Sequence, residues 1–242
     1  MGIVKPVGFF GARGEPNSYS LLLERAYGEY AYITNGNQTG LDMTDALTAE
    51  CWVTFASLPL SGNYYYLLCK CNSGFSSGWA FYVGYSDASN LLLRMAVADG
   101  SSHYCTVTWA NPSLDTWYHL AASGYTLSNT WYMQFTVNGN AQGSLQATGG
   151  GNITSNSDAF GLGSRPSSPA GRYHDGLIDD ARVWSEWRGT GPIGDNYNKQ
   201  LTGNETNLEG YWQLNNDLTD KTSNGNDLTP NGILSYSSSV PF

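Results

Sequence analysis

Apolar and polar residues alternate over most of this 242-residue chain, in short runs rich in Tyr, Trp, Phe, Val and Leu. Alternation with a period of two places successive side chains on opposite faces of an extended strand. Clusters of Gly, Asn, Ser and Asp separate the runs and favour turns. The pattern predicts strands at residues 18–24, 29–34, 47–55, 64–70, 78–85, 91–98, 104–109, 116–123, 131–137, 158–163, 176–184 and 208–214. We therefore expect an all-β protein of antiparallel strands.

Two local signals stand out against this background. Asn138-Gly139 lies between apolar runs, where a tight hairpin turn needs positive φ angles. Ile193, Tyr197 and Leu201 are spaced by four, which predicts one short helix near 191–201.

The alternation also indicates the domain organisation. No internal repeat and no charged or Pro-rich linker interrupts residues 17–229. We expect an N-terminal arm at 1–16 and a single domain at 17–242 that ends in a Ser-rich stretch.

The charge of the chain limits the classes of partner that we expect. The net charge is -9, and the 11 Lys and Arg residues are scattered singly, which argues against nucleic acid and anionic membranes. No apolar run reaches the roughly 18 residues of a membrane span. The first apolar stretch is short and broken by Pro6, so we expect no secretion signal. The expected location is the cytoplasm, or a virion surface or cell exterior reached by another route.

The four cysteines are predicted to be buried free thiols. Cys69 and Cys71 lie two residues apart on one strand face, a poor geometry for bonding each other.

Asp179 and Asp180 raise the question of an acidic site. Strict alternation puts Asp179 with Ala181 and Val183 on the inner face, and Asp180 with Arg182 on the other, so the two carboxylates are not expected to act as a pair. Asp180 and Arg182 can form an ion pair. Asp179 would anchor a loop by accepting hydrogen bonds, or would serve a ligand or metal; as an anchor, Asp179→Ala should cost about 1–3 kcal/mol.

Eight segments in order resemble the laminin G-like, pentraxin-related branch of the concanavalin A-like lectin and glucanase superfamily. They are "SYSLLLERAYGEYAYI", "LTAECWVTF", "DTWYHLAASG", "FTVNGN", "GLGSRP", "GLIDDARVWSEW", "LEGYWQLNND" and "DKTSNGNDLT". The resemblance implies a jelly-roll sandwich of two antiparallel sheets. It also implies that Trp52, Trp117, Trp184 and Trp212 pack in the scaffold. Trp79 shares a face with Phe81 and is predicted to be core, whereas Trp109, Trp131 and Trp187 are not explained by the resemblance.

Enzymatic activity is not expected. Glucanases of the superfamily carry an ExDxE strand motif, because glycoside hydrolysis needs two carboxyls about 5–9 Å apart. None of the 20 acidic residues shows that spacing, and no GxSxG elbow is present.

Calcium is the only cofactor that the sequence suggests, and none is required. The loop that holds calcium in pentraxins reads "SRPSSPAGRYH" here and has no acid before Asp175, so the resemblance implies no pentraxin-type site. Asp220, Asn224 and Asp227 alternate around Gly225 and form either a weak calcium site or an Asx-rich turn.

The resemblance and the loop composition favour a recognition module that binds a cell-surface glycan or protein. Candidate ligand-binding residues are Tyr64, Tyr65, Asn72, Trp131, Arg165, Tyr173 and His174. Trp131 alternates with Met133, Phe135 and Val137, so core packing is favoured over a ligand-binding role for it. Alanine at Tyr173 and His174 should weaken attachment without loss of stability, because both side chains are expected to be exposed. The alternative is a structural or decoration subunit of a virion or surface assembly, in which the terminal arms contact other subunits.

Overall fold

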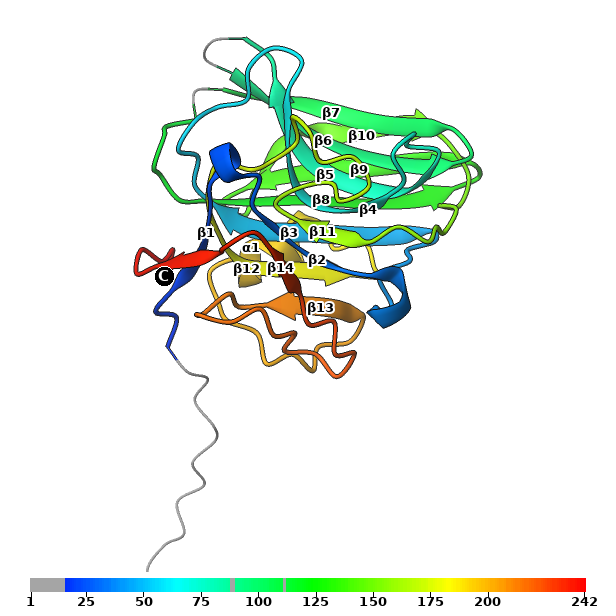
Figure 1. Cartoon of the computed structure of the whole chain (residues 1–242). Helices are drawn as coiled ribbons and strands as arrows, with labels where there is room; N and C mark the ends of the chain where they lie inside the picture. Colours follow the sequence, from blue (N-terminus) through cyan, green and yellow to red (C-terminus); the bar gives the residue numbers. More distant parts are fainter. Residues whose placement is uncertain (1–15, 88–89, 111) are drawn as a thin grey trace, which may run out of the picture.

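The computed structural model describes residues 16–87, 90–110 and 112–242, which form two packed antiparallel sheets (Figure 1). The eight-stranded sheet has the order β10 (Asn140–Gly149), β9 (Thr130–Val137), β8 (Tyr118–Leu127), β3 (Ala46–Val53), β12 (Gly176–Trp184), β1 (Ser20–Leu23) and β15 (Ser235–Ser237), with β13 (Leu208–Trp212) beside β12. The seven-stranded sheet has the order β14 (Thr229–Asn231), β2 (Tyr30–Ile33), β11 (Phe160–Leu162), β4 (Tyr64–Cys71), β5 (Ser77–Tyr85), β6 (Asn90–Asp99) and β7 (Ser102–Ala110). The predicted all-β sandwich is confirmed.

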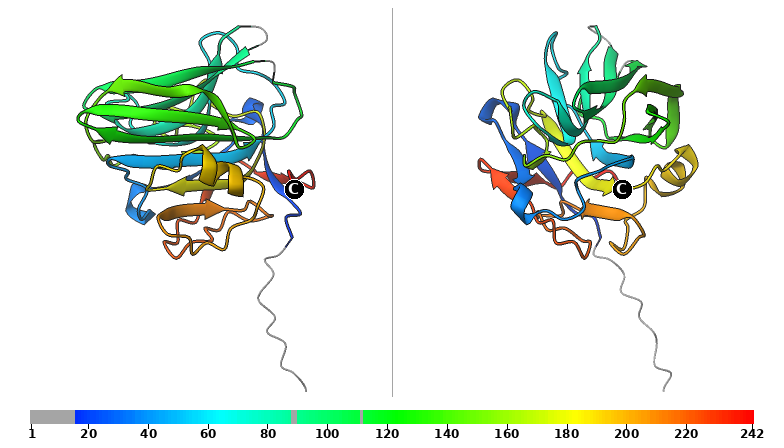
Figure 2. Two further views of the ribbon diagram at one scale, coloured as in Figure 1. Left: turned by 180° about the vertical axis from the view of Figure 1, so that it is seen from behind. Right: turned by 90° about the vertical axis from the view of Figure 1, so that its right-hand side faces the viewer.

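One α-helix, α1 (Thr190–Asn196), is found among the described residues, together with the 3-10 turns η1 (Arg25–Tyr27) and η2 (Asn35–Asn37). The helix predicted at 191–201 therefore exists but is shorter. Ile193 is its buried residue, and the helix lies on the outside of the eight-stranded sheet, near β9 and β10 (Figure 2). Leu201 packs separately, against the cluster that contains Trp184.

The predicted hairpin turn is confirmed. Asn138 and Gly139 have φ angles of 49° and 73°, and Val137 pairs with Asn140 across the turn. Since a left-handed backbone strains most residues but not Gly and only mildly Asn, this dipeptide sets the register of β9 with β10.

Most of the tryptophans expected in the scaffold are buried. Trp79 contacts Phe160 at 6.1 Å between ring centroids, and Phe160 stacks on Trp212 at 5.1 Å. Trp52 and Trp184 are buried outside the main core cluster. The expectation for Trp117 is wrong: it is only half-buried, because it lies just before β8 and donates to Ser239 Oγ at the surface.

The thiol prediction is also confirmed. The cysteines Cys51, Cys69, Cys71 and Cys105 are all free and buried.

A β-bulge in β12 overturns the predicted faces of the two aspartates. The register with β3 shifts between Asp179 and Arg182, and Asp180 has a φ angle of 48°. The main core holds Ile178 together with Ala181 and Val183, so one extra residue separates the two core-facing stretches. Asp179 therefore does not share the face of Ala181, contrary to strict alternation.

The predicted N-terminal arm lies outside the described residues except for Pro16. None of the helices in the described segments is long and apolar enough to cross a membrane.

Candidate functional site

Three of the predicted ligand-binding residues are completely buried. Tyr65 hydrogen-bonds Ser57 Oγ at 2.8 Å, and Trp131 donates to the Gly151 carbonyl at 2.8 Å. His174 packs edge-on against the rings of Phe55 and Tyr65, because its backbone N–H binds the Gly163 carbonyl and folds the 163–174 loop inward. The expectation of an exposed His174 is wrong, and alanine there would open a cavity.

The other four predicted residues each make local contacts of their own. Asn72 caps its own turn by accepting from the N–H groups of Ser76 and Ser77. Tyr173 packs near Tyr30, with ring centroids 6.2 Å apart. Tyr64 and Arg165 lie instead on the outer face of the seven-stranded sheet, beside Tyr82 and Tyr66 respectively. Ligand binding by these four residues stays a prediction.

The segment suggested for calcium is occupied by its own hydrogen bonds. Asp220 accepts the backbone N–H groups of Tyr211, Thr222 and Asn226 and the Thr222 hydroxyl, so both of its carboxylate oxygens are engaged. Asp227 accepts the Asp220 N–H, and Asn224 donates to Glu209. These hydrogen bonds form an Asx-rich turn, and calcium binding by Asp220, Asn224 and Asp227 stays a prediction. No cluster of three or more His, Cys, Asp or Glu suited to a metal occurs within the described ranges.

A buried charged network lies between the eight-stranded sheet and the chain that follows α1. Arg182 pairs with Asp180 and lies 3.7 Å from Glu50, and it donates to the carbonyls of Asn196 and Lys199. Burial alone would raise the pKa of Glu50, but His119, Arg182 and the Trp184 indole hold that pKa at about 2. Because the 196–199 backbone covers the network, we interpret it as the anchor of this segment and not as a reaction centre.

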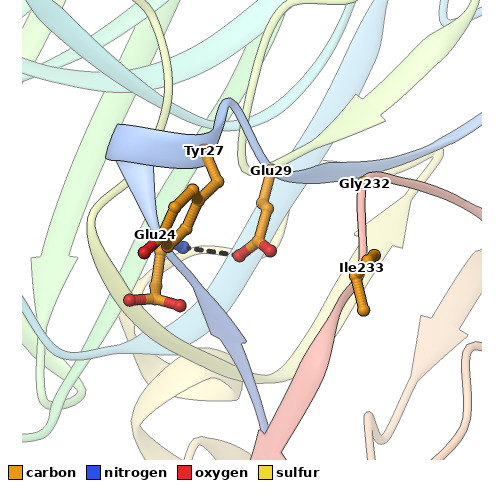
Figure 3. Close-up of a pocket in the computed structure, with 5 residues that line it drawn as sticks. All are labelled: Glu24, Tyr27, Glu29, Gly232 and Ile233. Carbon is orange, nitrogen blue, oxygen red and sulfur yellow. Dashed lines mark hydrogen bonds between the residues drawn. The ribbon is translucent and has the colours of Figure 1, made fainter.

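A cavity of about 420 Å³ lies beside η1, lined by Glu24, Tyr27, Glu29, Gly232 and Ile233 (Figure 3). Its two carboxyls do not resemble an acid–base pair. Glu29 is buried and accepts the Glu24 N–H at 3.0 Å, while the Glu24 carboxylate points away from it. The Glu29 carboxylate is used to fix the turn between β1 and β2.

A groove of about 470 Å³ opens on the outer side of the eight-stranded sheet. It is lined by Gln134, Leu145, Trp187, Gly189, Thr190, Gly191 and Pro192, none of which carries a charged side chain. Trp187 and Leu145 are each 44% exposed. The groove thus combines one large aromatic wall with uncharged polar groups, as many small-molecule sites do.

The sequence around Trp187 forces its ring outward. The Glu186 carbonyl accepts a hydrogen bond from Thr48, and the Arg188 N–H binds the hydroxyls of Thr48 and Ser123. These bonds hold the backbone on both sides of Trp187 against the sheet. A Cβ at Gly189 would lie only 3.1 Å from the Trp187 ring, so glycine lets the ring pack against the chain.

The ring of Trp187 is also supported from the sheet. It meets Tyr125 edge-on with centroids 5.3 Å apart, and Tyr125 stacks on Tyr132 at 5.3 Å. An aromatic ring that is fixed and half-exposed offers a flat apolar face at little entropic cost. In the sequence, Trp187 was a tryptophan that the family resemblance did not place in the core, and this was the available signal of the site. No such signal in the sequence pointed to Tyr125, Tyr132, Gln134 and Leu145.

The sequence matches a laminin G-type family model, described as the concanavalin A-like lectin/glucanases superfamily, over residues 27–190. The match covers more than half of the chain. The protein belongs to this superfamily. No curated protein matches the sequence of this family member.

Several solved structures share its fold. A candidate carbohydrate-binding protein from Bacteroides ovatus aligns with a TM-score of 0.64 at 17% identity, over 91% of this chain and 59% of that one. A heptameric SAP-like pentraxin from Limulus polyphemus aligns with a TM-score of 0.59 at 14% identity, over 91% of this chain and 94% of the pentraxin. The CBM40 of a Ruminococcus gnavus sialidase, bound to α2,3-sialyllactose, aligns with a TM-score of 0.50 at 13% identity, over 72% of this chain and 95% of the CBM40. At these identities the likeness shows the fold alone. The chain spans about 59% of the Bacteroides protein's length.

Proposed function

We propose that this superfamily member is a non-catalytic carbohydrate-binding module that holds a neutral sugar in the Trp187 groove. The observation that carries the proposal is the half-exposed Trp187 ring, held edge-on by Tyr125 in a groove of about 470 Å³. Sugars present apolar C–H faces that stack on aromatic rings, while their hydroxyls bond to uncharged donors and acceptors. Gln134 and Thr190 supply such groups along the groove.

Two further points support binding without catalysis. The groove lining includes no carboxylate, whereas glycoside hydrolysis ordinarily requires two carboxyl groups that flank the bond. Fold neighbours from Bacteroides ovatus and Ruminococcus gnavus are described as carbohydrate-binding, which makes a glycan the natural ligand class to test first.

The test is a glycan array followed by titration of the best neutral ligand. Trp187→Ala should weaken binding by about tenfold or more, because it removes the stacking face. Its stability should change little, since the side chain is 44% exposed.

Tyr27→Ala is the matched control, because it removes a 73%-exposed aromatic ring next to the other cavity. Equal affinities of wild type and Trp187→Ala would disprove the groove as the site. Weaker binding by Tyr27→Ala alone would move the site to the η1 cavity.

A further inference from the structure

The outer face of the seven-stranded sheet carries a row of tyrosine and arginine side chains. In strand register, Tyr66 of β4 pairs with Tyr82 of β5, Tyr82 with Arg94 of β6, and Arg94 with Thr106 of β7. Tyr66 and Tyr82 stack with centroids 4.7 Å apart. We call this surface the Arg94 face and define it by Tyr64, Tyr66, Tyr82, Arg94, Tyr104 and Arg165.

The Arg94 guanidinium lies among three aromatic rings. Its guanidinium carbon lies 4.6 Å from the Tyr104 centroid and 5.8 Å from those of Tyr64 and Tyr82. Its Nε donates to Thr106 Oγ1 at 2.9 Å, and its guanidinium also hydrogen-bonds the Tyr82 side chain. Tyr104 is 51% exposed and Arg94 is partly exposed, so the far edge of the guanidinium can be reached from solvent.

Arg165 adds a second guanidinium at the other end of the row. It lies 5.4 Å from the Tyr66 centroid, is only 5% exposed, and its Nε has no hydrogen-bond partner among the described residues. Four cations in the described segments pair with carboxylates: Lys70, Arg182, Arg188 and Lys221. Arg25, Arg172 and Lys199 form no ion pair with a described carboxylate. Neither Arg94 nor Arg165 forms an ion pair with a described residue, although the chain has 20 acidic residues.

Two unpaired guanidinium groups on a tyrosine surface are complementary to an anion that also has an apolar face. A guanidinium binds carboxylate or sulfate through two parallel hydrogen bonds, and the exposed ring of Tyr104 can pack against a sugar ring, whereas Tyr66 and Tyr82 are buried. We propose that the Arg94 face is a second binding site, separate from the Trp187 groove, for a sugar that carries a carboxylate or a sulfate group.

The proposal does not depend on the groove, since the two surfaces lie on different sheets. Burial raises the pKa of Tyr82, so its phenol stays neutral beside the Arg94 guanidinium with which it shares a hydrogen bond.

The experiment uses the full chain and three probes: a short oligogalacturonate, its neutral methyl ester, and a sulfated oligosaccharide. Wild type should bind at least one anionic probe, with affinity that falls as salt rises, and should bind the ester much more weakly. Arg94→Gln should lower the anionic affinity by about tenfold or more. Binding of the carboxylate or of the sulfate probe distinguishes the two anions.

Lys221→Gln is the matched control, because it removes one positive charge outside the Arg94 face, where Lys221 pairs with Asp217. Equal weakening by Lys221→Gln and Arg94→Gln would overturn the proposal in favour of net charge alone. Binding of neither anionic probe, or equal binding of the ester, would also overturn it.

Tyr104→Ala is a second variant that should fold normally, because the Tyr104 side chain is exposed. Tyr104→Ala should lower the affinity for the anionic probe, while Trp187→Ala should leave that affinity unchanged. If Trp187→Ala removes binding of the anionic probe, the acidic sugar binds in the groove and the Arg94 face is not the site.

Discussion

At the scale of single residues, Asp179 is a buried carboxyl with a structural role. It accepts hydrogen bonds from Asn17 Nδ2 at 2.7 Å and from the Asp180 N–H at 3.0 Å, so it anchors the chain that leads into β1. Burial raises its pKa to about 8, despite the Asn17 hydrogen bond that opposes the shift. Asp179→Ala should still cost about 1–3 kcal/mol, because both donors lose their acceptor.

The raised pKa of Asp179 predicts a loss of stability toward alkaline pH. The folded protein binds this proton more tightly than the unfolded chain, so its contribution is complete below the unfolded pKa near 4 and is lost as pH rises through about 8. Asp179→Asn removes the ionisation and should gain stability relative to wild type between these values. Denaturant unfolding across pH measures the difference, and a difference independent of pH would refute the prediction.

His174 has the opposite dependence. Its complete burial lowers its pKa to about 4 from the usual 6.5. Its contribution is therefore present above pH 6.5 and is lost as pH falls through about 4, because the unfolded chain takes up the proton first. His174→Phe keeps an aromatic ring against Phe55 and should lose less stability between pH 7 and about 5 than wild type. Parallel acid transitions of the two proteins would contradict this assignment.

At the scale of elements, the β9–β10 hairpin supports α1. A Cβ at Gly139 would lie 2.9 Å from Tyr197 and 3.0 Å from Gly194, at the C-terminal side of the helix. Gly139→Ala should therefore cost more than the roughly 1–2 kcal/mol of a left-handed alanine alone. Gly139→Ala should also weaken binding of the neutral sugar, since α1 begins at the groove residues Thr190 and Gly191.

Gly62→Ala isolates the backbone part of this effect. Gly62 has a φ angle of 80°, similar to the 73° of Gly139, but a Cβ there would meet nothing within 4 Å. Thermal melting of both variants, with sugar titration, makes the comparison. Equal losses would show that the contact with α1 contributes nothing.

At the scale of the whole molecule, the two proposed sites face away from the shared core on different sheets. The Trp187 groove is built on β8, β9 and the chain around α1, whereas the Arg94 face is built on β4 to β7 (Figure 1). The core between the sheets is closely packed, so a change on one outer face has no direct contact with the other. Arg94→Gln and Trp187→Ala are therefore expected to act independently. The net charge of -9 should oppose anions everywhere except where the unpaired guanidinium groups concentrate positive charge.

The sequence by itself determined the fold class, the hairpin at Asn138-Gly139, the buried free cysteines and the burial of Trp79, Trp184 and Trp212. The fold class, the hairpin, the thiols and the burial of Trp79 depend on period-two alternation and on local turn chemistry, which neighbouring residues specify. The burial of Trp184 and Trp212 was what the family resemblance implied. The same reasoning anticipated that Asp179 acts as a hydrogen-bonded anchor and that Asp180 pairs with Arg182.

Tertiary structure alone decided the faces of β12, the burial of His174 and the composition of both candidate sites. The bulge at Asp180 inserts one residue, and a single insertion exchanges the faces that alternation assigns. His174 is buried because its loop folds back onto Gly163. Trp187 meets Leu145, and Tyr66 meets Arg94 through Tyr82, only because the sheets bring distant strands together. Contacts between residues far apart in the chain leave no trace in a local pattern, so only the packed sandwich places these side chains side by side.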